Sequence, residues 1–217
     1  MFELATGPKR KLLDAALHVI RAQGYAGSSV DDICRQAGVT KGSFFHHFKS
    51  KDELAVAATE HWTGVTGNLF ASAPFRSIAD PRERVLAYID LRAALIEANR
   101  ELPDFTCLLG TMVQETFETH PDIREACNLS IVAHAQTVAN DLAEARLMHA
   151  PGASWEPLDV ALFMQAAIQG AFILAKVQHD PAAATRAIAH LRNYVASLLA
   201  DDQPAMKPGT AATTRRR

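Results

Sequence analysis

The sequence predicts an all-α protein of about nine helices. Three observations support this fold class. Apolar residues recur at the three-to-four-residue spacing of amphipathic helices, capping residues and prolines stand where those helices would start, and no run between turn signals shows the two-residue alternation of a strand. With 217 residues, of which 48% are hydrophobic, the chain can bury one or two ordinary cores.

An apolar face defines the first predicted helix, which ends at Gly24. The residues of that face are Leu13, Ala16, Leu17 and Ile20. Ser29 is the expected N-cap of a second, short helix. Asp31 and Asp32 lie in its first turn, where the helix dipole favours anions, and Gly38 ends it.

The expected starts of two further helices follow closely in the sequence. Thr40 can cap a third helix over residues 41–48. Ser50 and Glu53 have the spacing of a capping box, with the hydroxyl at the N-cap and the acid three residues later. We expect this fourth helix to reach about Leu69.

An acid followed by proline marks two later starts, Asp80-Pro81 and Asp180-Pro181, because proline suits the first helical position. Further starts or breaks are expected at Pro103, Pro121 and Pro157. These signals predict helices over residues 81–99, 104–118, 122–149, 157–178 and 182–200.

Composition indicates the compartment and one charged patch. No apolar run is long enough to span a bilayer and no secretory pattern stands at the start, so we expect a cytoplasmic protein. The cysteines Cys34, Cys107 and Cys127 show no metal or disulfide spacing. The net charge is only −2, yet Val39 to Lys51 contains three lysines, two histidines and no acid. This stretch could face an anionic partner.

The third predicted helix has two different sides. Phe44 and Phe48 fall together and should pack onto the first two helices, against Leu17, Ile20 and Ile33. The opposite side carries small and polar residues, which are Gly42, Ser43 and His46, flanked by Phe45, with Thr40 and Lys41 at the N-terminus. Two short helices joined at a glycine have the proportions of a helix-turn-helix, whose second helix enters the DNA major groove.

Residues 9–61, above all "SSVDDICRQAGVTKGSFFHHFKSKDEL", resemble the DNA-binding domain of the tetracycline-repressor (TetR) family. The resemblance is carried by Gly38, Val39, Lys41, Gly42, His47, Phe48, Lys51 and Leu54. It implies that base edges and adjacent phosphates are contacted by Thr40, Lys41, Gly42 and Ser43. It further implies that the DNA backbone is held by His46, His47 and Lys51, and that Ser29 caps a helix whose start nears a phosphate.

One position departs from the family pattern, which usually has tyrosine where this chain has Phe45. Phe45 can offer only apolar contact, for instance with a thymine methyl. The alternative to DNA contact is that the lysine-rich stretch is merely a solvated face. A metal pair of His46 and His47 is disfavoured because neighbouring residues point about 100° apart on a helix. Arg215–Arg217 is expected to be a solvated tail.

The resemblance gives a domain organisation: a flexible arm (1–8), a helix-turn-helix domain (9–50), a linking helix (51–71), a ligand-binding and dimerisation domain (72–200) and a disordered tail (201–217). It implies that the larger domain encloses a small-molecule cavity. The candidate lining residues are Trp62, Tyr88, Leu95, Phe105, Cys107, Met112, Phe117, His134 and Phe163. Their aromatic and methionine content favours an apolar or aromatic effector, and the alternative is plain hydrophobic core.

The segment "FTCLLGTMVQE" (105–115) resembles a TetR subgroup in which a cysteine opens the sixth helix and responds in some members to oxidants or electrophiles. This makes a redox regulator acting through Cys107 an alternative. Against it, Thr106 replaces the usual glycine, and no lysine or arginine stands nearby in the sequence to lower the thiol pKa.

The last two predicted helices are the candidates for dimerisation. The helix at 157–178 is apolar on nearly every face, so other helices must cover it on all sides. Candidate interface residues are Phe163, Ala167, Gly170, Ala171, Leu174, Leu191, Tyr194 and Leu198. A two-fold dimer would place two recognition helices about 34–36 Å apart, which implies a palindromic operator.

No catalytic or phosphate-binding motif is present in the sequence, and no two histidines stand four residues apart. We therefore predict a homodimeric transcriptional regulator without enzymatic activity, cofactor or metal. The expected function is repression, with palindromic operator DNA as one partner and a small releasing effector as the other. A non-specific architectural DNA-binding protein is the alternative from another class.

Overall fold

The computed structural model describes residues 7–99 and 101–200, and within them every regular element is helical, which confirms the all-α prediction. The elements are α1 (Gly7–Gln23), α2 (Val30–Ala37), α3 (Lys41–His47), α4 (Lys51–Ala71), a 3-10 turn η1 (Pro74–Ser77), α5 (Pro81–Ala98), α6 (Leu102–Phe105), α7 (Leu108–Thr116), α8 (Pro121–His149), α9 (Pro157–Gln178) and α10 (Pro181–Leu198). The predicted tail and most of the predicted arm lie outside the described residues.

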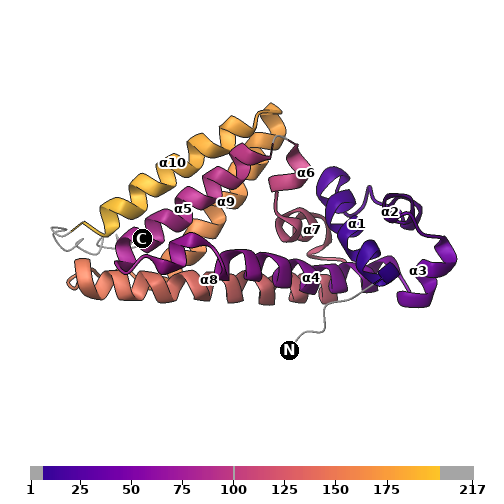
Figure 1. Cartoon of the computed structure of the whole chain (residues 1–217), viewed down its shortest axis with the longest axis horizontal. Coiled ribbons are helices and arrows are strands. Elements are labelled where there is room, and N and C mark those ends of the chain that lie inside the picture. Colours follow the sequence, from indigo (N-terminus) through magenta and orange to yellow (C-terminus); the bar gives the residue numbers. More distant parts are fainter. Residues whose placement is uncertain (1–6, 100, 201–217) are drawn as a thin grey trace, which may run out of the picture.

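The molecule is elongated, with α1, α2 and α3 at one end (Figure 1). Helices α5, α9 and α10 lie at the other end, and α8 runs beneath them. Helix α4 connects the two ends and lies alongside α8, while α6 and α7 sit between α1 and the distal helices (Figure 1). A change at the distal end can therefore reach α1–α3 through α4 or α7.

Local capping fixes the helices at the N-terminal end. Ser29 and Asp32 form a reciprocal capping box at the start of α2, and Gly38 ends that helix in the left-handed conformation with φ of 64°. The side chain of Thr40 accepts a hydrogen bond from the Ser43 amide over 3.1 Å. These three predictions are confirmed because each cap depends only on residues a few positions away.

Of the two hydrogen bonds of the capping box predicted at the start of α4, one is present and the other is wrong. Ser50 Oγ accepts from the Glu53 amide over 3.1 Å, as expected. The Glu53 carboxylate, however, accepts from the amide of Lys49 over 2.7 Å rather than from that of Ser50. The acid therefore ties the preceding loop to the helix start.

The single helix predicted over 104–118 is also wrong. It is divided into α6 and α7, with Cys107 as the extended N-cap of α7 at φ −85° and ψ 127°. The backbone carbonyl of Thr106 accepts a long bond from the Arg21 side chain of α1 over 3.5 Å. Because this contact comes from a residue 85 positions away, the local sequence pattern does not reveal the break.

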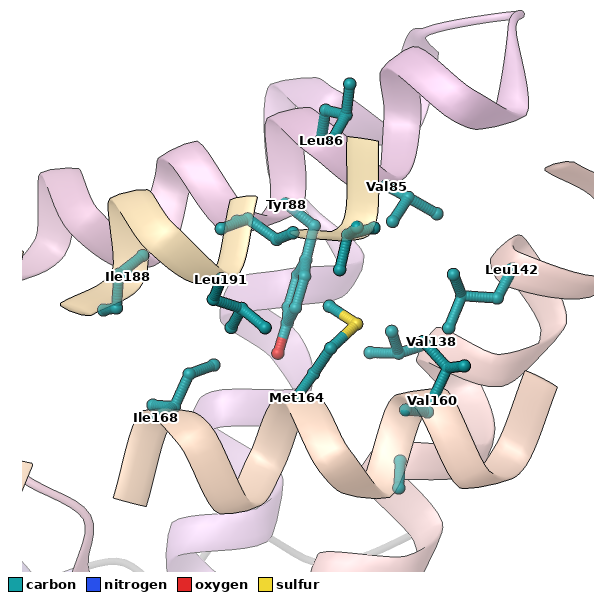
Figure 2. Packing of buried hydrophobic residues seen from close by; sticks show 14 of the residues in the cluster. Val85, Leu86, Tyr88, Val138, Leu142, Val160, Met164, Ile168, Ile188 and Leu191 are labelled. Carbon is teal, nitrogen blue, oxygen red and sulfur yellow. The ribbon is translucent and has the colours of Figure 1, made fainter. Parts of the chain in front are cut away.

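Two hydrophobic cores hold the fold. The N-terminal core joins α1–α4 to α7 and the start of α8, and it includes Leu12, Ile33, Phe44 and Met112. The distal core joins α5, α8, α9 and α10. Figure 2 shows Tyr88 of α5 and Met164 of α9 side by side in this core, among aliphatic side chains that include Val138, Ile168 and Leu191.

By length and composition alone, α9 could cross a membrane. In this structure it packs against α8 and α10, and its side chains Val160, Met164, Ile168 and Phe172 belong to the distal core. One side of α9 thus belongs to the core of the larger domain.

Candidate DNA-binding surface

Helix α3 is anchored from one side. Phe44 is fully buried and Phe48 is 2% exposed, and both pack in the N-terminal core with Leu17, Ile20 and Ile33. The predicted core role of the two phenylalanines is therefore confirmed. Their rings contact each other with centroids 5.8 Å apart.

The opposite side of α3 is open. Thr40, Lys41, Gly42 and His46 are exposed, and Phe45 keeps 53% of its surface accessible. A Cβ atom added at Gly42 would meet only Thr40 Oγ1, at 3.8 Å. This face could therefore approach another surface closely at Gly42.

Positive charge surrounds this open face. Lys41 lies at the first turn of α3, where the unpaired backbone amides also carry partial positive charge. Its ammonium pairs with Asp31 of α2 at 3.1 Å, and both side chains are exposed. Because an exposed pair contributes little, a phosphate could take the place of Asp31. The rings of His46 and His47 pack edge to face with their centroids 4.9 Å apart. Ser43 and His47 are half-buried.

Lys51 has an intramolecular role that its sequence position does not indicate. Its ammonium donates to the backbone carbonyls of Tyr25 and Ser28, each over 3.0 Å, and lies 4.1 Å from the Tyr25 ring centroid. The Tyr25 hydroxyl donates to Asp52. Burial, together with that bond and the Asp52 charge, raises the pKa of Tyr25. Lys51 and Asp52 therefore fasten the loop that leads to Ser29 and α2.

Some of the predicted ligand-lining residues do lie together in the distal domain. The Tyr88 hydroxyl and His134 Nε2 are hydrogen-bonded over 2.8 Å, and Gln165 Nε2 donates to the Tyr88 oxygen over 3.4 Å. Burial, with the charges of Arg92 and Arg76, lowers the pKa of His134 to about 4. The imidazole is therefore neutral near pH 7. Leu95 and Phe105 pack against the same core.

Other predicted lining residues lie elsewhere. Met112 is fully buried in the N-terminal core, and Trp62 packs against it with the Arg21 guanidinium 5.0 Å from its ring. Phe117 and Phe163 lie at the surface, each about half exposed. The nine predicted residues thus do not form one lining.

Two concavities stand out among the described residues, and none of the predicted effector residues lines either of them. One, of about 250 Å³, lies between α1 and α2 beside His18 and Arg35. The other, of about 320 Å³, lies between α5 and α10 beside Asp90, Ala93 and Arg192.

The structure places a lysine near Cys107, which is half-buried at the break before α7. Burial lowers the pKa of Lys176, and the nearby Cys107 and Glu115 partly offset that effect. Lys176 Nζ donates to Thr111 Oγ1 over 3.1 Å. In contrast, burial raises the pKa of Cys127 to about 11 and also raises that of Cys34. A lysine therefore lies near Cys107, as Lys41 does near Cys34.

The predicted dimer residues divide into two groups. Ala171, Leu191 and Leu198 are buried in the distal core of the chain itself. Phe163, Leu174 and Tyr194 remain 45–49% exposed, and the rings of Phe163 and Tyr194 contact each other at 5.1 Å. Ala167 and Gly170 are half-buried between these groups. An apolar surface on α9 and α10 therefore remains available.

Comparison with known proteins gives two family matches. Residues 12–58 match the model of bacterial regulatory proteins of the tetR family, and residues 81–191 match the LmrA/YxaF-like transcriptional regulator C-terminal domain. The chain is 24% identical to the HTH-type transcriptional repressor NemR of Escherichia coli over 87% of this chain and 94% of NemR. It is also 26% identical to the regulator LmrA of Bacillus subtilis, over 55% of this chain and 63% of LmrA.

Solved structures show the same fold. The crystal structure of reduced E. coli NemR matches with a TM-score of 0.73 at 24% identity, over 86% of this chain and 95% of that one. A TetR regulatory protein from Rhodobacter sphaeroides matches with a TM-score of 0.75 at 22% identity, over 85% of this chain and 97% of that one. The two family matches cover both the helix-turn-helix and the distal helices, and the chain belongs to the TetR family of transcriptional regulators.

Proposed function

We propose that this protein is a cytoplasmic repressor that binds palindromic operator DNA as a homodimer and is released by a small effector bound in the distal domain. The observation that carries the proposal is the shape of α3. One side of this short helix is fixed by Phe44 and Phe48, while the side with Gly42 is bare and open. An anchored helix with an open, cationic N-terminal face suits entry into a major groove.

We assign distinct roles to the residues of this surface. Thr40, Lys41, Gly42 and Ser43 would contact base edges and neighbouring phosphates. His46 and His47 would contact the backbone, and Phe45 would contact a thymine methyl. Ser29 begins α2 next to the loop that Lys51 fastens, so Lys51 would act by holding this helix start in place.

The test is a binding comparison on DNA selected by the protein from a random duplex pool. The selected sequence should be palindromic, and the dimer should bind it about a thousandfold or more tightly than a scrambled duplex of the same composition at the same salt concentration. Lys41→Ala should lower the slope of log K against log salt by about one. Equal affinity for the two duplexes would instead identify a non-specific architectural binder.

A second candidate function is redox sensing through Cys107. The observation that favours it is the half-buried position of Cys107 at the start of α7, where the Thr111 hydroxyl donates to the Cys107 carbonyl over 2.9 Å and accepts from Lys176 over 3.1 Å. Hydrogen peroxide would oxidise the thiol to a sulfenic acid and would itself be reduced to water. The change in charge and hydrogen bonding at the start of α7 could then alter the helix that contacts the α1–α2 loop.

Peroxide treatment of three cysteine variants tests this candidate. Cys107→Ser should remain bound to operator under peroxide, whereas Cys34→Ser and Cys127→Ser should be released like the parent protein. Release of Cys107→Ser by peroxide would remove the redox function and leave the small-effector proposal in place.

A further inference from the structure

A half-buried arginine lies among aromatic rings in the distal domain. Arg92 is one helical turn after Tyr88 on α5. Its guanidinium carbon is 5.4 Å from the ring centroid of Phe70 on α4 and 5.9 Å from that of Phe172 on α9. The cation thus lies where α4, α5 and α9 meet.

Among the described residues, Arg92 differs from Arg76, Arg84 and Arg192 in having no carboxylate as an ion-pair partner. Arg76 and Arg84 both bind Asp141, at 2.6 and 2.9 Å, and Arg192 binds Asp90 at 2.6 Å. Among the described residues, no carboxylate or carbonyl accepts a hydrogen bond from Arg92. Contacts with ring faces leave the five N–H donors at the edge of a guanidinium without acceptors.

The polar side chains closest to the Phe70 ring are neutral. This ring contacts His134, which forms a hydrogen-bonded chain with Tyr88 and Gln165. Arg76, the other cation that lowers the pKa of His134, is already paired with Asp141. Among the described residues, the charge of Arg92 therefore lies next to apolar rings without a carboxylate paired to it.

We propose that Arg92, whose guanidinium lies over the buried rings of Phe70 and Phe172, binds the carboxylate of an aromatic or apolar organic acid. This inference rests on the proposed function and names the chemical class of its effector. A guanidinium can donate two parallel bonds to a carboxylate, and a half-buried site makes that pair stronger than it would be in water. The inference changes the expectation from an apolar molecule to an amphiphilic anion.

The competing explanation is that Arg92 is structural and simply covers the two rings with its stem and guanidinium. In that case its charge would matter little to a ligand, and a side chain of equal length without charge would serve as well. Methionine is about as long as the aliphatic stem of arginine and carries no charge, so Arg92→Met separates the two explanations while keeping the packing of the stem.

Calorimetric titration of the full chain with paired probes tests the proposal. The probes are 3-phenylpropanoate and 2-naphthoate, each compared with its neutral amide. At least one acid should bind tenfold or more tightly than its amide, and Arg92→Met should remove this preference. Arg186→Met is the matched control, because Arg186 is an exposed arginine of the same domain that pairs with Asp180. It should bind the acid like the parent protein.

Three results would overturn the proposal: neither acid binds below about 1 mM, acid and amide bind equally, or Arg92→Met retains the acid preference while its thermal unfolding matches the parent. The operator experiment is independent of these titrations. If a neutral molecule releases operator DNA while the acids do not bind, the carboxylate inference fails and the repressor proposal stands. If no operator can be selected, the repressor proposal fails whatever the titrations show.

Discussion

Lys51 links the start of α4 to the loop before α2 through one ammonium group. Lys51→Met removes two charge-assisted bonds to the carbonyls of Tyr25 and Ser28. Because both carbonyls then lose a partner in a partly buried site, we expect the free energy of unfolding to fall by about 2 kcal/mol. Urea unfolding monitored by circular dichroism measures this change.

Lys49→Met is the control for this substitution, since Lys49 is an exposed lysine two residues earlier. It should leave the free energy of unfolding within about 0.5 kcal/mol of the parent value. If the two methionine variants unfold alike, Lys51 does not fasten the loop.

His134 makes stability depend on pH in a defined window. Its pKa is about 4 in the folded chain against 6.5 for an ordinary histidine. Between these values the unfolded chain binds more protons, so acidification favours unfolding. The contribution is fully present above pH 6.5 and is lost as the pH falls towards 4. Relative to His134→Gln, the parent should lose about 2–3 kcal/mol between pH 7 and 4.5.

Glutamine is the suitable replacement because its amide can either donate to or accept from the Tyr88 hydroxyl. Unfolding in urea at several pH values gives the difference between the two proteins. A difference that stays constant from pH 7 to 4.5 would mean that His134 is not held neutral by its surroundings.

At the scale of elements, α7 joins the distal domain to the DNA-binding end. Its first turn follows Cys107, and near its last turn Glu115 accepts a hydrogen bond from the Ala26 amide over 2.7 Å. A Cβ atom at Gly24 would overlap the Glu115 carboxylate, so this side chain also lies tightly against the loop. The Tyr25 ring meets His120, just after α7, edge to face at 5.3 Å. The loop between α1 and α2 is thus held by α7 as well as by α4.

Glu115→Ala should loosen this loop. Loss of one charge-assisted bond, about 1 kcal/mol, corresponds to roughly fivefold faster hydrogen exchange in residues 24–28. Glu118→Ala, an exposed acid one turn later, should leave exchange in the loop unchanged. Equal protection of the loop in both variants would show that α7 does not hold it.

The elements that the sequence predicted well are those defined by nearby residues. The caps at Ser29 and Thr40 and the left-handed Gly38 follow from residues within four positions. The Thr106 carbonyl at the break before α7 accepts from Arg21, 85 residues earlier. The partners of Lys51 lie more than 20 residues from it, and Lys176 lies about 70 residues after Cys107. Contacts of that separation leave no periodic signal in the sequence, so no pattern could have indicated them.

At the scale of the whole molecule, the exposed apolar side chains of α9 and α10 form the proposed dimer surface. Phe163, Leu174 and Val177 of α9 are 47–74% exposed, next to Tyr194 of α10. The sequence predicted the helices of this surface but could not separate the side chains that face a partner from those, such as Leu191, that fill the chain's own core. Both kinds share the same helical spacing.

Leu174→Asp should therefore convert the dimer to a monomer at micromolar concentration, because the carboxylate would be buried in the interface without a partner. Leu147→Asp on α8 is the control, since Leu147 is 73% exposed and lies outside this surface. Sedimentation velocity measures both. A dimeric Leu174→Asp protein would place the interface elsewhere.

Operator binding by Gly42→Glu tests the central claim most directly, which is that the bare face of α3 meets DNA. Space at Gly42 is open in the free protein, so the variant should fold with unchanged helicity. A carboxylate on this face would be repelled by phosphates and would fill the groove, so binding should fall at least a hundredfold, or about 3 kcal/mol. Gly64→Glu, at an equally open helical glycine of α4, should bind operator like the parent. Operator affinity of Gly42→Glu equal to that of Gly64→Glu would contradict the account.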